Sequence, residues 1–219
     1  MRILLSILFV VLGSYGVLGE KLYTCTCVPG LLKAKLGLSA PKAFMKHGIT
    51  PRFMPVPPKD KLNCAFMTAN VELGNFIDPL RTIDMKYIAY PHGKSDVKYT
   101  LFIVDFDGKQ GPPPNAYLIG MYVNVPNSEN LLIGGDIAVP YIKPVATLES
   151  GIHRVAALLY EQNDHIDPDD MELMKLIKTR VIQLVPMVKK YNLKPEPIAG
   201  AFYTSELNLC INKPLKSDL

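Results

Sequence analysis

Short apolar segments separated by turn residues recur along the chain from Leu62 onward. Those long enough to form β-strands or strand pairs cover residues 64–73, 85–90, 97–106, 116–125, 131–139 and 152–162. Ile198–Tyr203 has the same character near the C-terminus. Several segments, such as Tyr99–Val104, are apolar at both alternating positions, which is typical of strands covered on both faces. The pattern predicts one mainly β domain.

One strong helical pattern comes late in the chain. The run Asp167–Asp170 offers a helix N-cap, a first-turn proline, and acidic side chains at the end of a helix that favours them. Apolar residues then follow at helical spacing, at Met174, Ile177, Val181, Leu184 and Val188. We interpret them as a stripe that packs on the core rather than on a membrane. Pro186 is expected to kink or split this helix.

The N-terminus has the order of a secretion signal. Arg2 precedes an apolar run, Ile3–Leu12, and small residues lead to Gly19. We predict a cleaved signal peptide of residues 1–19, with an earlier cut after Gly16 as an alternative and a buried N-terminal element as a weaker one. No stretch reaches the roughly 18 apolar residues of a transmembrane segment. The mature protein is expected to be secreted and extracellular.

The predicted domains are an N-terminal arm, residues 20–61, and a β domain, residues 62–219. Between Leu31 and Pro58 the arm is basic and contains several prolines, which favours an extended segment or loop. Its one helix candidate is Pro41–His47.

All four cysteines follow the predicted signal peptide: Cys25, Cys27, Cys64 and Cys210. In an oxidising compartment they predict two disulfides. A direct bridge between Cys25 and Cys27 would be strained, so each is expected to pair with Cys64 or Cys210. Metal binding is a weaker alternative, because neither a CxxC motif nor clustered histidines accompany the thiols. We therefore expect no metal.

The composition excludes several classes of protein. A chain that is 48% hydrophobic and 20% charged is neither intrinsically disordered nor collagen-like. The formal net charge of +4 is too small and too dispersed for a nucleic-acid groove. Because no glycine-rich phosphate loop is present, we expect no nucleotide cofactor, and no other cofactor is indicated.

The informative polar residues lie between Val97 and Gln162. Asp105 and Asp107 end one strongly apolar strand, and His153 and Arg154 open another. If the two strands are neighbours, the four side chains can form one ionisable cluster at the sheet edge. The alternative is a mutually satisfied structural network, with Asp107 and Arg154 as its most plausible pair.

An enzyme would have to use Ser150, His153 and Asp105, the nearby residues of nucleophile, base and carboxylate type. Nothing in the sequence requires Ser150 and His153 to face each other, and a nucleophile-elbow motif is absent. We therefore expect no enzymatic activity.

An ordered set of motifs connects this sequence to a known family. They are Val71–Gly74 with Pro79, Tyr99–Leu101 before Asp105–Asp107, Val123–Val125, Tyr141, Gly151–Arg154 with Tyr160–Gln162, and Tyr191–Leu193 before Ile198–Gly200. In order and spacing this set resembles the phosphatidylethanolamine-binding proteins. The resemblance implies an antiparallel Greek-key β-sandwich with a few peripheral helices, and a small pocket for phosphate-like anions, including phospholipid head groups. Asp105 and Asp107 match the family's paired acids, His153 matches its second pocket histidine, and Tyr141 falls on a family position.

The sequence also departs from the family pattern in ways that make the expected pocket more apolar. Phe106 separates the two acids, Leu118 or Ile119 falls where the family has its first pocket histidine, and Val155 replaces a tyrosine after Arg154. The predicted ligand-binding residues are Asp105, Phe106, Asp107, Tyr141 and His153, with Arg154 in a structural network.

These observations favour a secreted, non-enzymatic protein that binds a phospholipid or another small amphipathic ligand. The alternative is a protein-interaction module of protease- or kinase-inhibitor type, in which the pocket is vestigial and a protein partner binds at the surface. The arm at Leu31–Pro58 and the loop at Pro112–Pro114 are the expected places for such a partner.

Overall fold

The computed structural model describes residues 37–108, 110–144 and 150–207. The predicted signal peptide, residues 20–36 of the predicted arm, and Cys25, Cys27 and Cys210 fall outside these residues. The predicted signal peptide and disulfide pairing therefore stay predictions.

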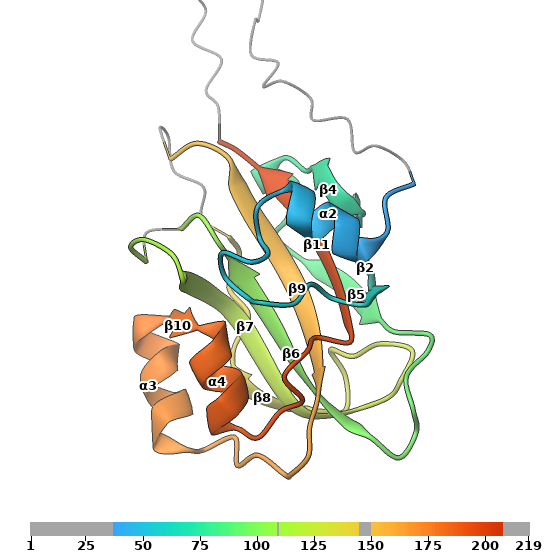
Figure 1. The fold of residues 1–219 in the computed structure, drawn as a ribbon, viewed down its shortest axis with the longest axis vertical. Helices are drawn as coiled ribbons and strands as arrows, with labels where there is room; N and C mark the ends of the chain where they lie inside the picture. Colours follow the sequence, from blue (N-terminus) through green and yellow to red (C-terminus); the bar gives the residue numbers. More distant parts are fainter. Residues whose placement is uncertain (1–36, 109, 145–149, 208–219) are drawn as a thin grey trace, which may run out of the picture. The chain divides into compact units, whose positions relative to one another are not determined.

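Eight strands form one large sheet (Figure 1). Its main path runs through β1 (Asp60–Lys61), β11 (Ala199–Ser205), β9 (His153–Glu161), β6 (Lys98–Asp105), β7 (Asn115–Pro126) and β10 (Val181–Gln183). In addition, β4 (Leu73–Phe76) pairs with β11 and β8 (Asp136–Val139) pairs with β7. The expected antiparallel pairing holds from β11 through β10. It is wrong for β1 and β4, which both run parallel to β11, so the sheet is mixed.

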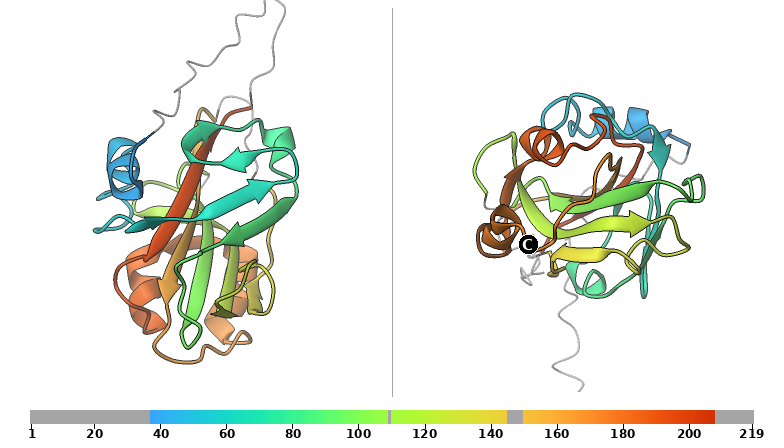
Figure 2. Two further views of the ribbon diagram at one scale, coloured as in Figure 1. Left: turned by 90° about the vertical axis from the view of Figure 1, so that its right-hand side faces the viewer. Right: turned by 90° about the horizontal axis from the view of Figure 1, so that it is seen from below.

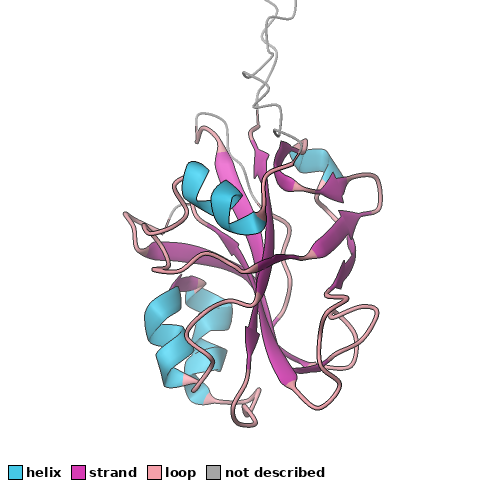
Figure 3. Ribbon diagram, turned by 45° about the vertical axis from the view of Figure 1, so that its right-hand side comes forward, coloured by secondary structure: helices cyan, strands magenta, loops and turns pink. Residues whose placement is uncertain are grey.

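A second, antiparallel sheet contains β3 (Asn70–Val71), β2 (Asn63–Phe66) and β5 (Met85–Ala89). Figure 2 shows these strands lying across the large sheet. The helices are α2 (Ala40–Lys46), α3 (Met171–Thr179) and α4 (Leu184–Lys190), with one 3₁₀ turn, η1 (Pro79–Arg81). Figure 3 shows α3 and α4 together near one end of the large sheet and α2 near the other. The described chain is thus mainly β with a few helices.

The large sheet is buried on both faces. Along β9, Ala156, Leu158 and Tyr160 pack in one apolar cluster with residues of all three helices. Val155, Ala157 and Leu159 pack in a second cluster with residues of the small sheet. We call these sides the helical face and the small-sheet face. Seven of the eight residues of β6 are buried, which confirms the prediction of a covered central strand.

The described part of the predicted arm packs against the β domain. The helix expected at Pro41–His47 forms as α2, and Phe44 is fully buried with its ring edge-on to Phe202 at 4.8 Å. Beyond the helix, Phe53 is also buried in the cluster of the helical face. Residues 37–61 therefore contribute to the core instead of projecting from it.

The late helical pattern forms two helices separated by β10. Asp170 caps α3 by accepting from two backbone N–H groups, and Arg180, at φ 52°, ends it in the left-handed conformation. The predicted split therefore occurs before Pro186, which lies in the first turn of α4, where a missing N–H costs little.

This split changes which apolar residues are buried. Leu184 and Val188 pack in the core as predicted. The core prediction is wrong for Met174, Ile177 and Val181, which are 54%, 41% and 40% exposed. The break at Arg180 resets the helical phase, so one continuous stripe cannot face the core across both helices.

Two of the sequence motifs meet in a buried polar network. The side chain of Gln162, at the end of β9, accepts from the Asn124 backbone N–H at 2.7 Å and donates to the Asn124 carboxamide at 3.0 Å. It also accepts from the Thr100 hydroxyl at 2.9 Å. Asn124 in turn exchanges hydrogen bonds with both backbone groups of Ile166. The network ties β6, β7 and β9 to the segment before α3.

Replacing Gln162 by Leu should destabilise the protein by about 2–4 kcal/mol, because several buried polar groups lose their partner together. The matched control is Gln183→Leu, at an exposed position on β10, which should change the free energy of unfolding by about 0.5 kcal/mol or less. Urea unfolding measures both. Equal effects for the two variants would show that the network contributes no specific stability.

Candidate functional site

The predicted site begins where β6 ends. Asp105 is 3% exposed, and its Oδ1 accepts the Asp107 backbone N–H at 2.9 Å, which turns the chain as the strand finishes. The other carboxylate oxygen, Oδ2, lies 2.7 Å from His153 Nδ1 on the neighbouring strand β9. Because a carboxylate only accepts, Nδ1 is the donor of this bond.

His153 continues the chain of hydrogen bonds to Ser150, whose Oγ lies 2.8 Å from Nε2. The structure therefore brings together Asp105, His153 and Ser150, a contact that the sequence did not require. The hydrogen bond from Asp105 raises the pKa of His153 above 6.5, burial opposes this, and the charges of Asp105 and Asp107 add to the rise. This environment favours an imidazolium held between a carboxylate and a hydroxyl.

Asp107 and Arg154 form a separate pair. Arg154 Nε and Nη2 each donate to a different Asp107 oxygen at 2.7 Å, and the Arg154 backbone N–H adds a third bond at 3.0 Å. Arg154 Nη1 donates to the His47 carbonyl oxygen at 2.6 Å. The single ionisable cluster suggested by the sequence is therefore two pairs, because consecutive residues of β9 point to opposite faces of the sheet. Asp105–His153 lies on the small-sheet face and Asp107–Arg154 on the helical face.

The other predicted ligand-binding residues divide in the same way. Phe106 is buried on the helical face, where its ring packs on Phe53 at 4.6 Å, so it lies apart from His153. Tyr141 packs against the cluster of the small-sheet face and donates from its hydroxyl to the Thr82 carbonyl at 3.0 Å. Burial raises its pKa, and Tyr122 and Asp84 add to the rise.

Tyr203 belongs to this region, although the sequence placed it only in a strand. It lies on β11 opposite Val155, and its side chain is buried on the small-sheet face. Burial raises its pKa well above 10, and the proximity of Tyr141 and Asp105 adds to the effect. Tyr203 lies two residues before Ser205, so both side chains point to the same face of the strand, and this spacing is visible in the sequence. In the structure Ser205 pairs with His153.

The apolar residues at which the sequence departs from the family pattern are buried. Leu118 and Ile119 are both fully buried, Leu118 on the helical face and Ile119 on the small-sheet face. Ile119 thus places an aliphatic side chain on the same side of the sheet as His153 and Tyr141. Val155 does the same from the strand that carries His153.

Cys64 is a buried thiol on β2 with no disulfide partner among the described residues, and burial raises its pKa to about 12. Within residues 37–108, 110–144 and 150–207, no group of three or more His, Cys, Asp or Glu side chains could hold a metal ion. None of the helices in the described part of the chain is long and apolar enough to cross a membrane.

The two histidines beside Arg154 should titrate in opposite directions. We expect the pKa of His153 to lie above 6.5 and that of His47, lowered by burial and by Lys46 and Arg154, to lie below it. Asp105→Asn should lower the pKa of His153 without changing its burial. NMR titration of the imidazole protons measures both values, and a His153 pKa that Asp105→Asn leaves unchanged would contradict the assignment.

The raised pKa has a consequence for stability. The stabilising contribution of charged His153 is fully present below pH 6.5 and is lost as the pH rises through its folded-state pKa. Urea unfolding should therefore show a decline across this window that is smaller in Asp105→Asn. His92→Gln, at an exposed histidine, is the control.

Comparison with known proteins places this geometry in a recognised fold, although no family model matches the sequence. The putative odorant-binding protein A5 of Drosophila melanogaster is 24% identical over 176 residues, which cover 77% of this chain and 81% of that protein.

Among solved structures, a carboxypeptidase Y inhibitor in complex with its cognate proteinase superposes with a TM-score of 0.64 at 18% identity, over 80% of this chain and 98% of the inhibitor. The phosphatidylethanolamine-binding protein of Plasmodium falciparum gives 0.60 at 17% identity, over 78% and 99%. That of Plasmodium vivax gives 0.56 at 14% identity, over 76% and 97%. The chain therefore has the fold of the phosphatidylethanolamine-binding proteins, which confirms the resemblance indicated by its motifs.

Proposed function

We propose that this protein is secreted and binds a small amphipathic or phospholipid-type ligand at Asp105, Tyr141 and His153, without enzymatic activity. The observation that carries the proposal is the buried chain Asp105–His153–Ser150 at the edge of an otherwise apolar face. A buried ion pair of this kind costs desolvation energy, and replacement by apolar residues is often neutral or stabilising. Its presence beside buried aromatic hydroxyls favours a role in recognition.

The chemistry of the site suits a polar head group with charges of both signs. The His153 imidazole and the Ser150 hydroxyl can donate to anionic oxygens, and the carboxylate of Asp105 attracts a cationic group. Ile119 and Val155 supply the apolar side. One cavity between the sheets, lined by Ile103, Val155, Tyr203 and neighbouring residues, measures about 10 Å³, which is too small for an acyl chain. This favours a ligand whose apolar part is short or lies along the surface.

The named relatives support a ligand-binding role. Two of the structural neighbours are called phosphatidylethanolamine-binding proteins, and the curated relative is called a putative odorant-binding protein. Both names refer to small ligands with an apolar part. The signal peptide predicted at residues 1–19 is the basis for proposing secretion.

The second candidate is a protein-interaction module of inhibitor type. The inhibitor bound to its proteinase has the same fold, and apolar residues occupy the position of the family's first pocket histidine. In this case a protein partner would bind through the surface, and its binding would persist when His153 is replaced. Persistence of partner binding in His153→Ala therefore separates the two candidates.

Native mass spectrometry of the secreted protein, with lipid extraction of whatever co-purifies, tests the proposed ligand. We expect a stoichiometric small amphipathic lipid, and His153→Ala and Asp105→Asn should reduce the affinity for a short-chain phosphatidylethanolamine about tenfold or more. His92→Ala is the control, and thermal melting checks that each variant is folded. A wild-type protein that purifies empty and does not bind the added phospholipid would contradict the proposal.

Because Ser150 lies within hydrogen-bond distance of His153, the proposed absence of catalysis needs a direct test. The sequence has no nucleophile-elbow motif, and this is the ground for proposing that the contact is structural. On this proposal we expect no fluorophosphonate adduct on Ser150 at neutral pH, and no ester hydrolysis above the rate of His153→Ala. Intact-mass spectrometry detects the adduct. A His153-dependent adduct on Ser150 would instead identify an acyl-transfer enzyme.

A further inference from the structure

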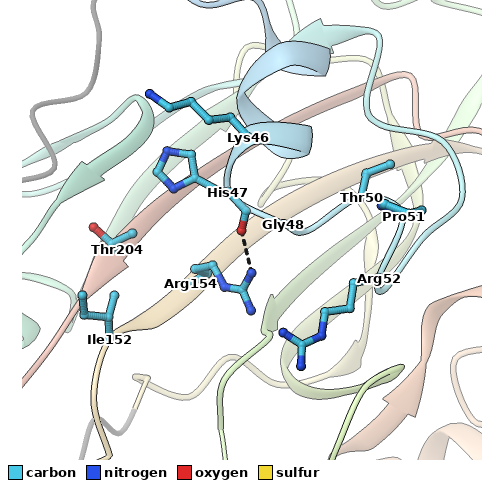
Figure 4. Close-up of a pocket in the computed structure, with 9 residues that line it drawn as sticks. All are labelled: Lys46, His47, Gly48, Thr50, Pro51, Arg52, Ile152, Arg154 and Thr204. Atoms are coloured by element: carbon cyan, nitrogen blue, oxygen red, sulfur yellow. Dashed lines mark hydrogen bonds between the residues drawn. The ribbon is translucent and has the colours of Figure 1, made fainter.

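A groove of about 670 Å³ lies on the helical face, on the opposite side of β9 from His153 (Figure 4). Its walls come from the end of α2 and the loop that follows, and from β9 and β11. We call it the basic groove. The residues that line it are Lys46, His47, Gly48, Thr50, Pro51, Arg52, Ile152, Arg154 and Thr204. Its volume lies within the range of small-molecule sites.

The groove carries an excess of positive charge. Lys46, Arg52 and Arg154 line it, and none of its lining residues is acidic. The charge of Arg154 is balanced by Asp107. Among the described residues, no ion pair involves Lys46 or Arg52. Two positive charges therefore remain uncompensated around one concave surface.

One buried aromatic ring positions both guanidinium groups. The Arg154 guanidinium carbon lies 5.5 Å from the centroid of Phe53, and that of Arg52 lies 5.9 Å from the same centroid. Phe53 itself is 2% exposed and packs on Phe106. Figure 4 shows Arg154 between His47 and Arg52, with its hydrogen bond to the His47 carbonyl. Because Asp107 balances Arg154, the Arg52 guanidinium is the uncompensated charge held beside this ring.

Polar groups of the groove also point to a ligand. Thr50 is 6% exposed, and its hydroxyl makes no hydrogen bond with any described residue, which is costly for a buried polar group. His47 is held edge-on to Phe202 at 4.9 Å. Its pKa is lowered by burial and then by the charges of Lys46 and Arg154, which indicates a positive potential at this imidazole.

We propose that the basic groove is a second ligand site, which binds the dianionic phosphate group of a phosphate monoester, with Arg52 as the donor and Lys46, on the opposite side of the groove, adding to the positive potential (Figure 4). A planar guanidinium can donate two parallel hydrogen bonds to phosphate, and an ammonium contributes a compact positive charge. The phosphate can belong to a soluble molecule or to the head group of an anionic lipid. The site is independent of the ligand proposed for Asp105 and His153.

NMR titration of the full chain with inorganic phosphate at constant ionic strength tests the proposal. We expect saturable binding and a rise in the pKa of His47, because a bound dianion offsets the positive potential around it. The double variant Lys46→Gln/Arg52→Gln should weaken binding about tenfold or more. Lys42→Gln, an exposed lysine of α2 outside the groove, should change the affinity less than twofold. Equal weakening by Lys42→Gln, or no saturable binding, would overturn the proposal.

Two further arms identify the site and the source of the phosphate. His153→Ala should retain phosphate binding, whereas loss in His153→Ala with retention in the double variant would overturn the proposal and assign the phosphate to the Asp105–His153 site. Sedimentation with phosphatidylcholine vesicles, with and without phosphatidic acid, tests the lipid source. Dependence of vesicle binding on both phosphatidic acid and Lys46/Arg52 would identify the phosphate as a lipid head group. Binding of inorganic phosphate alone would identify a soluble ligand.

Discussion

The register of β6 against β9 is the constraint on which both sites depend. Asp105 pairs with Val155, and the Phe106 backbone N–H donates to the Arg154 carbonyl at 3.0 Å. The pleat of β9 then sends His153 to the small-sheet face and Arg154 to the helical face, while the turn stabilised by the Asp105 carboxylate delivers Asp107 to Arg154. A shift of one residue would exchange the two faces of β9, breaking both ion pairs and misplacing the side chains that pack in both apolar clusters. Fold specificity and site chemistry are therefore set by the same few backbone hydrogen bonds.

Much of the fold could be predicted from the sequence, because it depends on local periodicity. The doubly apolar run at Tyr99–Val104 indicated a covered strand, and α2 forms within one residue of its predicted limits. The exposure of Met174 and Ile177 could not be predicted, because it depends on Arg180 ending α3 early and on where β10 then pairs. The parallel pairing of β1 and β4 with β11 is likewise a long-range feature that leaves no periodic signal.

The candidate site was predictable in residue type and not in arrangement. Asp105 and His153 were identified as pocket residues through the family motifs, but the motifs do not say that Phe106 packs on Phe53 away from them. Ser150 was noted as a nucleophile type, and only the structure brings its hydroxyl to His153. Lys46 and Arg52 lay in a segment interpreted as an arm. Their place in one groove with Arg154, which is 102 to 108 residues away along the chain, therefore had no sequence signal.

The two sites differ in net charge, and this difference decides which ligand each can hold. At the small-sheet face His153 is paired with the Asp105 carboxylate, so the site carries no excess positive charge and suits a head group that carries both signs or little charge. At the helical face Asp107 offsets Arg154 alone, and the remaining charges of Lys46 and Arg52 favour a strongly anionic group. The opposite shifts in the pKa of His153 and His47 agree with this division, because a carboxylate contacts His153 whereas Lys46 and Arg154 lie near His47. A dianion at the small-sheet face would be repelled by the buried Asp105 carboxylate, and none of the residues that line the basic groove is acidic.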